Sequence, residues 1–182
     1  MSLTVGQMFP VDIAVDSARG TLRLSEMLGD GSLVVAFHRL WCPFCQQAAR
    51  ELAAAKGEFD ALGARVVIVY RDSVDFVLRA CARRATPFDC VCDTHGELTA
   101  AANVEPFSRV RYWAFSPRKL VKALRSGSHV DKTTTRLLEG RATFVLDGNA
   151  RIVYAHTSVN AADIPPIRDI LAAVQSVTQP TR

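Results

Sequence analysis

The feature that most limits how this chain can fold is a pair of short, almost continuous apolar runs rich in β-branched residues. These runs are Leu33–Phe37 and Arg65–Tyr70, and such runs are typical of strands buried on both faces of a sheet. Between them, apolar residues recur at spacings of three and four from Pro43 until Gly63, which predicts an amphipathic helix. Alternation of strands and helices predicts an α/β architecture.

The remaining pattern continues this alternation within 182 residues, of which 49% are apolar, so we expect a single domain over residues 1–182. The segments with the clearest signals are a half-buried strand at Val11–Val15, a turn at Ser17–Gly20, a helix from the Ser73 cap to Arg84, a strand at Phe88–Asp93, a short helix at Gly96–Ala102, a helix opened by Ser116-Pro117, a hairpin of Ala142–Leu146 with Arg151–His156, and a last helix beginning at Asp163.

Charge is mild overall and uneven along the chain. The net charge is +4, too small by itself to indicate nucleic-acid binding, but nine basic and only two acidic residues lie between Phe107 and Arg141. Such a patch either meets an anionic partner or is a solvated helix face. No apolar run is long enough to span a bilayer, and the first residues do not form a secretory signal. We therefore expect a cytoplasmic chain with no membrane or nucleic-acid partner.

The chemistry concentrates where the first buried run leads into Trp41-Cys42-Pro43-Phe44-Cys45. Pro43 suits the first turn of a helix, so Cys42 should lie at a helix N-terminus, where unpaired N–H groups and the helix dipole stabilise a thiolate. A second cysteine three residues later can resolve an oxidised first one. His38 and Arg39 can add positive charge, and Trp41 is expected to pack as a wall over the site.

Other interpretations of the cysteines remain open. Cys42 and Cys45 can be half of a zinc site completed by Cys90 and Cys92 or by His95, although two cysteines opening a long helix are unlike most zinc ligands. They can also be two incidental buried residues. Cys81 is most simply a small buried side chain, and Cys90 with Cys92 on one strand face is more simply structural than functional. We expect no metal and no cofactor.

Several segments together resemble one family. They are Gly6–Pro10, Gly20–Ser25, Trp41–Cys45, Arg141–Asp147 and Tyr154–Leu171. With them the chain is similar to bacterial peroxiredoxin-like proteins of the alkyl hydroperoxide reductase/thiol-specific antioxidant group, in the thioredoxin-fold superfamily. The resemblance implies a thioredoxin-like fold with a central mixed β-sheet flanked by helices. It also implies a helical basic insertion around residues 104–136.

The resemblance also implies roles for individual residues. Cys42 falls where the family carries the peroxide-attacking cysteine, Cys45 would resolve its sulfenic acid as a disulfide, and Arg141 falls where an arginine polarises the peroxide and holds the thiolate. Substrates would be small peroxides or disulfides, the reductant a thioredoxin- or glutathione-type thiol, and the assembly a homodimer. Two family residues are replaced, a threonine by Arg39 and a proline by Val35, which weighs against efficient peroxidase turnover.

Two alternatives share the fold. The first is a thiol-disulfide oxidoreductase, but thioredoxins place a cis-proline where this chain has Gly140–Thr143 without proline, which favours a small peroxide or anionic substrate over a protein disulfide. The second is a non-catalytic module in which the cysteine pair does no chemistry.

Overall fold

A computed structural model describes residues 2–29, 31–128 and 138–178. Its strands are β1 (Ala14–Ser17), β2 (Gly20–Arg23), β3 (Leu33–Phe37), β4 (Arg65–Tyr70), β5 (Asp89–Cys92), β6 (Ala142–Leu146) and β7 (Ile152–Thr157). Its helices are the 3-10 turn η1 (Leu24–Met27), α1 (Pro43–Ala54), α2 (Lys56–Ala61), α3 (Val74–Arg83), α4 (Glu97–Ala101), α5 (Arg109–Trp113), α6 (Pro117–Arg125) and α7 (Ile167–Thr178).

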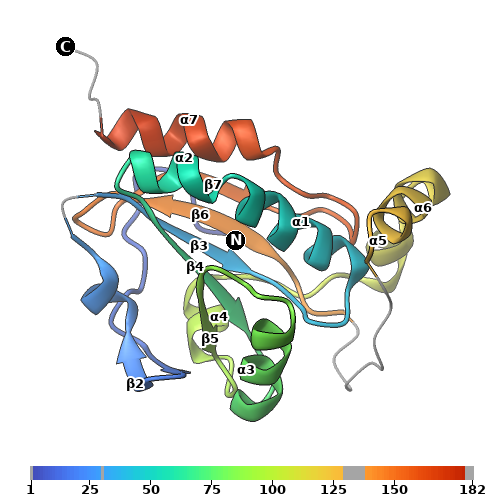
Figure 1. The fold of residues 1–182 in the computed structure, drawn as a ribbon, viewed down its shortest axis with the longest axis horizontal. Coiled ribbons are helices and arrows are strands. Elements are labelled where there is room, and N and C mark those ends of the chain that lie inside the picture. The colour runs from blue at the N-terminus through green and yellow to red at the C-terminus, as the bar shows by residue number, and fades with distance from the viewer. Residues whose placement is uncertain (1, 30, 129–137, 179–182) are drawn as a thin grey trace.

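The strands form one mixed sheet in the order β2-β1-β5-β4-β3-β6-β7 (Figure 1). The three central strands β3, β4 and β5 are parallel, and the flanking β6–β7 and β1–β2 hairpins are antiparallel. The two runs predicted to be buried strands are β3 and β4, beside each other at the centre, and every residue of β3 is buried. The fold class predicted from the sequence, a mixed sheet flanked by helices, is confirmed.

Side chains on the two faces of the sheet form separate cores. Helices α1, α2 and α7 pack on one face through apolar residues such as Leu52, Phe59 and Ile170, and α3 covers the same face over β4 and β5. On the opposite face, the N-terminal segment and α4 pack around the rings of Phe9 and Phe144, whose centroids lie 5.2 Å apart. With both faces covered, the central strands carry apolar side chains in both directions, as their sequence indicated.

One helix and two boundaries differ from the sequence prediction. The helix predicted from Pro43 to Gly63 is divided at Ala55 into α1 and α2. The first strand is Ala14–Ser17, later than the predicted 11–15, because the chain before it forms turns in which Ser25 N–H donates to the Val11 carbonyl. The last helix begins at Ile167, whereas Asp163 belongs to the loop before it, since two prolines in sequence and the hydrogen bonds of Asp163 keep that loop out of helical register.

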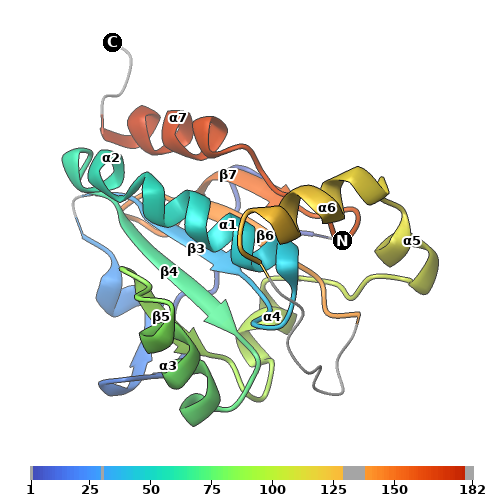
Figure 2. The ribbon, with the colours of Figure 1, turned by 45° about the vertical axis from the view of Figure 1, so that its right-hand side comes forward.

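The predicted basic insertion is helical where it is described. Residues 104–128 contain α6, as predicted from Ser116-Pro117, and the additional short helix α5, while residues 129–136 lie outside the described residues. Figures 1 and 2 both place α5 and α6 at one end of the molecule, beside the N-terminal end of α1. The insertion therefore lies at the end of the helix that carries the cysteine pair.

Candidate active site

Cys42 and Cys45 lie where strand β3 gives way to helix α1. Cys42 is the N-cap residue, with extended backbone angles, and Pro43 occupies the first helical position. The first helical bond runs from Gln46 N–H to the Cys42 carbonyl at 3.0 Å. Proline is accepted there because that position has no intrahelical N–H partner to lose. The predicted helix start is therefore confirmed, with both sulfurs within the first turn.

Each sulfur faces a buried guanidinium. Arg141 donates from Nη1 to the Cys45 sulfur at 3.4 Å, and Arg39 donates from Nη2 to the Cys42 sulfur at 3.7 Å. The sequence predicted Arg141 as the partner of Cys42, and the structure instead places it against Cys45, with Arg39 against Cys42. The residue that replaces the family threonine thus supplies a second positive charge to the pair, where a neutral hydroxyl would supply none.

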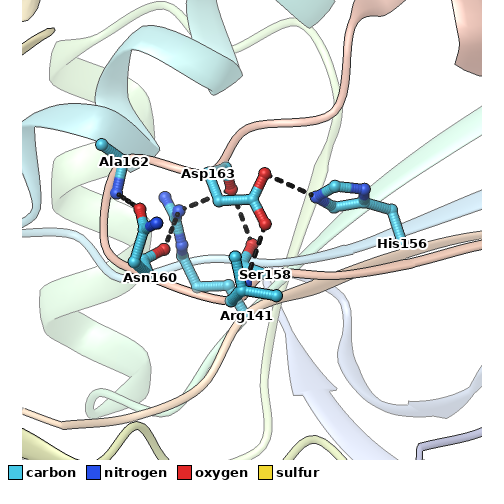
Figure 3. A network of polar contacts seen from close by, with 7 residues as sticks. Arg141, His156, Ser158, Asn160, Ala162 and Asp163 are labelled. Carbon is cyan, nitrogen blue, oxygen red and sulfur yellow. Dashed lines mark hydrogen bonds and ion pairs between the residues drawn. The ribbon is translucent and has the colours of Figure 1, made fainter. Parts of the chain in front are cut away.

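The Arg141 guanidinium is held in place by the loop between β7 and α7 (Figure 3). Its Nη2 donates to the backbone carbonyls of Asp163 at 2.9 Å and Asn160 at 3.3 Å. The Ser158 hydroxyl donates to the same Asp163 carbonyl at 2.8 Å. Because these bonds hold Nη2 while Nη1 donates to the Cys45 sulfur, they fix the direction in which the cation points.

The Asp163 side chain shapes that loop. Its Oδ2 accepts from the Val159 N–H at 2.7 Å, and its Oδ1 lies 3.3 Å from Nε2 of His156, an ion pair when the imidazole is protonated. The sequence pattern indicated Asp163 as a helix start and gave no sign of its bonds to Val159 and His156. The residues around Arg141 bind it mostly through backbone carbonyls, and because every residue has a carbonyl, residue type does not predict such contacts.

Arg39 is fully buried against three aromatic rings. Its guanidinium carbon lies 4.8 Å from the centroid of Trp41, 5.6 Å from that of Phe107 and 5.2 Å from that of Tyr112. Ring faces attract a cation, and a desolvated one more strongly than an exposed one. Trp41 is a packing wall, as predicted, and the structure adds that it holds the cation next to Cys42.

The pKa values of the two thiols shift in opposite directions. Cys42 donates a hydrogen bond to Cys45, and this bond, together with burial, raises the pKa of Cys42 well above its ordinary value. Burial opposes ionisation of Cys45, but the bond from Cys42 and the charge of Arg141 overcome it and lower the pKa of Cys45 well below the ordinary value. The sequence predicted the resting thiolate on Cys42. Both the donated hydrogen bond and the Arg141 guanidinium lower the pKa of the second sulfur, which favours the negative charge on Cys45.

His38 is not the cation that its position in the sequence suggested. Burial, with the neighbouring arginines, lowers its pKa to about 4, so the imidazole is neutral near pH 7. Along with Arg141, Thr143 and Asp163 it lines a cavity of about 10 Å³. The positive charge at the site therefore comes from arginine.

Aromatic residues of the insertion cover the pair. Phe107 and Tyr112 are buried in one cluster with Trp41 and both cysteines, with Phe115 packed against it. Cys42 and Cys45 are each 1% exposed. The packing of Tyr112 and Phe115 anchors the insertion over the cysteine pair.

The other cysteines form a second cluster on the same face of the sheet. Cys81 of α3 and Cys90 of β5 are joined by a disulfide, which corrects the prediction that Cys81 is a lone buried residue. Cys92 is a free thiol, and burial raises its pKa to about 11. Since Cys90 is bonded to Cys81, it supplies no thiolate to the alternative zinc site.

Fold and site together define a thiol-based redox protein with a thioredoxin-like fold. Residues 5–155 match the model of the AhpC/TSA family, and the chain belongs to that family. This confirms the resemblance seen in the sequence. Within the described residues, no helix combines the length and the apolar composition needed to cross a bilayer.

Solved structures of peroxiredoxins share the fold. Peroxiredoxin Q of Xanthomonas campestris is 22% identical, with a TM-score of 0.70 over 96% of this chain and 99% of that one. Peroxidoxin BcpB of Mycobacterium tuberculosis is 19% identical, with a TM-score of 0.69 over 96% and 98%. The 1-Cys peroxiredoxin B of Oryza sativa subsp. japonica is 31% identical over 74 residues, 40% of this chain and only 33% of that protein.

Proposed function

We propose that this chain is a thiol peroxidase in which Cys42 reduces a small peroxide and Cys45 resolves the product. One observation carries the proposal: two adjacent thiols each face a buried guanidinium group, Arg39 against Cys42 and Arg141 against Cys45. A single negative charge is stabilised there, and a thiolate is the form of cysteine that attacks peroxides. Membership of the AhpC/TSA family supports the same chemistry.

The hydrogen bond between the thiols suggests how the proton moves. As the Cys42 sulfur attacks the outer peroxide oxygen, its proton passes to the Cys45 thiolate, the O–O bond breaks, and the leaving alkoxide takes that proton as an alcohol. Cys42 is then a sulfenic acid and Cys45 again a thiolate. Cys45 attacks the sulfenic sulfur, hydroxide leaves and is protonated to water, and a Cys42–Cys45 disulfide remains.

The two guanidinium groups stabilise negative charge at different steps of this reaction. Arg39, against the Cys42 sulfur, is placed to meet the charge that develops on the peroxide oxygens, because that is the sulfur that attacks. Arg141, against Cys45, holds the resting thiolate. Fixed cations of this kind act strongly in a site from which water is excluded.

Turnover requires a reductant and access. We propose a thiol reductant of the thioredoxin or glutathione type in a reducing cytoplasm, which would return the disulfide to two thiols. Since both cysteines are 1% exposed, peroxide and reductant reach them only when Phe107 and Tyr112 move aside. Disulfide exchange with protein substrates is the less favoured alternative, because residues Gly140–Thr143 hold no proline where thioredoxins place a cis-proline.

The test compares Cys42→Ser, Cys45→Ser and wild type for peroxide consumption with a dithiol reductant. We expect Cys42→Ser to be inactive, and Cys45→Ser to consume one peroxide per chain and hold a sulfenic acid that a dimedone-type reagent traps. Reduction of insulin disulfides without peroxide consumption would instead favour the exchange alternative. Equal peroxide consumption by wild type and Cys42→Ser would overturn the proposal.

A further inference from the structure

The charged side chains on the outer surface of residues 107–128 are all basic. We call residues 107–128, which contain α5 and α6, the basic cover, because their inner side packs over the cysteine pair. This segment has no acidic residue, and its basic residues are Arg109, Arg111, Arg118, Lys119, Lys122 and Arg125. All six are exposed. Charge of one sign and this density attracts an anionic surface.

Large apolar side chains stand among these charges. Val110 is 82% exposed, Trp113 63%, Val121 46% and Leu124 42%. Each helix contributes two of them three residues apart, so the pair shares one side of its helix. The core does not need them, because other residues of the same helices, Tyr112 and Ala123 among them, already cover the cysteines.

The outer side of α6 is also hollowed. An open hollow of about 610 Å³ is lined by Pro117, Arg118, Val121, Lys122, Arg125 and Ser126. Three cations and a hydroxyl therefore surround an aliphatic floor. A phosphodiester next to methylene groups has the matching chemistry, since its oxygens accept from guanidinium and ammonium groups and its carbons pack on Val121.

We propose that the basic cover docks on the surface of an anionic phospholipid bilayer. Exposed tryptophan and aliphatic side chains interleaved with arginine and lysine are what a helix lying in the lipid interface presents. The projection of α5 and α6 from one end of the molecule (Figure 2) lets them meet a flat surface without the sheet in the way.

Other binding partners match fewer of the exposed side chains on the basic cover. A nucleic acid would satisfy the charges but leave Val110, Trp113 and Leu124 without apolar partners. A second copy of the chain meeting the same face would set like charges against each other. The expectation of no membrane partner came from the lack of a spanning segment and a signal, whereas this contact is peripheral. It does not depend on the peroxidase chemistry.

Vesicle sedimentation tests the proposal with the full chain. We expect binding to phosphatidylcholine vesicles containing about 30% phosphatidylglycerol, little binding to pure phosphatidylcholine, and release as salt rises from about 0.1 to about 0.5 M. The double variant Lys122→Glu/Arg125→Glu should bind about tenfold or more weakly. Its matched control, Arg79→Glu/Arg168→Glu, reverses two exposed charges on α3 and α7 and should bind as the wild type does.

Trp113 supplies a second readout that does not depend on a variant folding well. The chain has two tryptophans, of which Trp41 is buried and Trp113 exposed, so brominated lipid in anionic vesicles should quench only the Trp113 part of the fluorescence. A Trp113→Phe variant should lose that quenching. Equal binding to neutral and anionic vesicles, or binding to a soluble polyglutamate but not to vesicles, would overturn the proposal, the latter in favour of an acidic protein partner.

Discussion

Two cysteine clusters on one face of the sheet have opposite chemistry. Cys42 and Cys45 are thiols that face Arg39 and Arg141. In the other cluster, Cys81 and Cys90 are disulfide-bonded and Cys92 is a thiol with a raised pKa. All five residues are buried, so burial does not separate the clusters. Buried cations do, because in the described structure they contact only the first pair.

The cause of each pKa shift shows the same contrast. For Cys92, burial acts first and nearby carboxylates, Asp16 and Asp72, act in the same direction. For Cys45, burial acts against ionisation, but a donated hydrogen bond and the charges of Arg141 and Arg39 outweigh it. A buried thiol becomes reactive only where the fold supplies compensating charge.

The largest expected effect comes from removing the cation at the first cluster. Arg141→Gln should lower the rate of peroxide reduction about 100-fold or more, because a buried cation is replaced by a neutral amide. Stopped-flow peroxide reduction measures this. Arg151→Gln is a matched control, since Arg151 is exposed and donates to the Gly6 carbonyl far from the sulfurs. An Arg141→Gln rate within twofold of wild type would remove the distinction between the clusters.

The next effect is on stability and follows from His38. Its pKa is lowered in the folded chain to about 4 from 6.5, so the unfolded chain binds its proton first as pH falls. Stability should therefore decrease between about pH 6.5 and pH 4, by about 3 kcal/mol from this group. Denaturant unfolding should show a flatter pH dependence in His38→Gln. An unchanged slope would mean that His38 is protonated in the folded chain.

The second cluster should contribute to stability and not to turnover. Cys81→Ser removes a disulfide that closes a short loop, which should lower the free energy of unfolding by about 2–3 kcal/mol. Urea unfolding without reductant measures this, and addition of a reductant should bring the wild type to the value of the variant. Peroxide consumption should be unchanged. A fall comparable to that of Cys42→Ser would make the second cluster part of the reaction.

A smaller effect is expected from the loop that aims Arg141. Asp163→Ala removes the acceptor for the Val159 N–H and should slow peroxide reduction about tenfold, whereas Asp163→Asn keeps an acceptor and should retain more activity. Asp147→Ala is the matched control, because Asp147 accepts similar bonds from Asn149 and Arg151 at a different turn. If the two alanine variants slow the reaction equally, Asp163 is structural only.

Local signals predicted the parts of the site that are local in sequence. The β3 strand and the Pro43 helix start followed from run length and from the proline, and both cysteines are where those elements put them. The partner of each sulfur was not predictable in this way. Arg141 reaches Cys45 across 96 residues, and its direction depends on carbonyls of a loop, which any residue type can supply.

Contacts between elements that are distant in the sequence were also not predictable from local patterns. The Cys81–Cys90 disulfide depends on α3 packing on β5, and no local signal in the sequence brings Cys81 of a helix beside Cys90 of a strand. The loss of the His38 charge has the same origin, because burial is a tertiary property. A local sequence pattern predicts the element on which a residue lies, but it does not predict which distant residues surround its functional group.

The central claim is that the Cys42–Cys45 pair carries one thiolate at neutral pH. Ultraviolet absorbance near 240 nm, followed from about pH 9 to pH 5 in wild type and in Cys92→Ser, measures thiolate content directly. The account predicts about one thiolate per chain well below the ordinary cysteine pKa of about 8.5, lost in Arg141→Gln and retained in Cys92→Ser. Absorbance that appears only above about pH 8.5 in the wild type would contradict it.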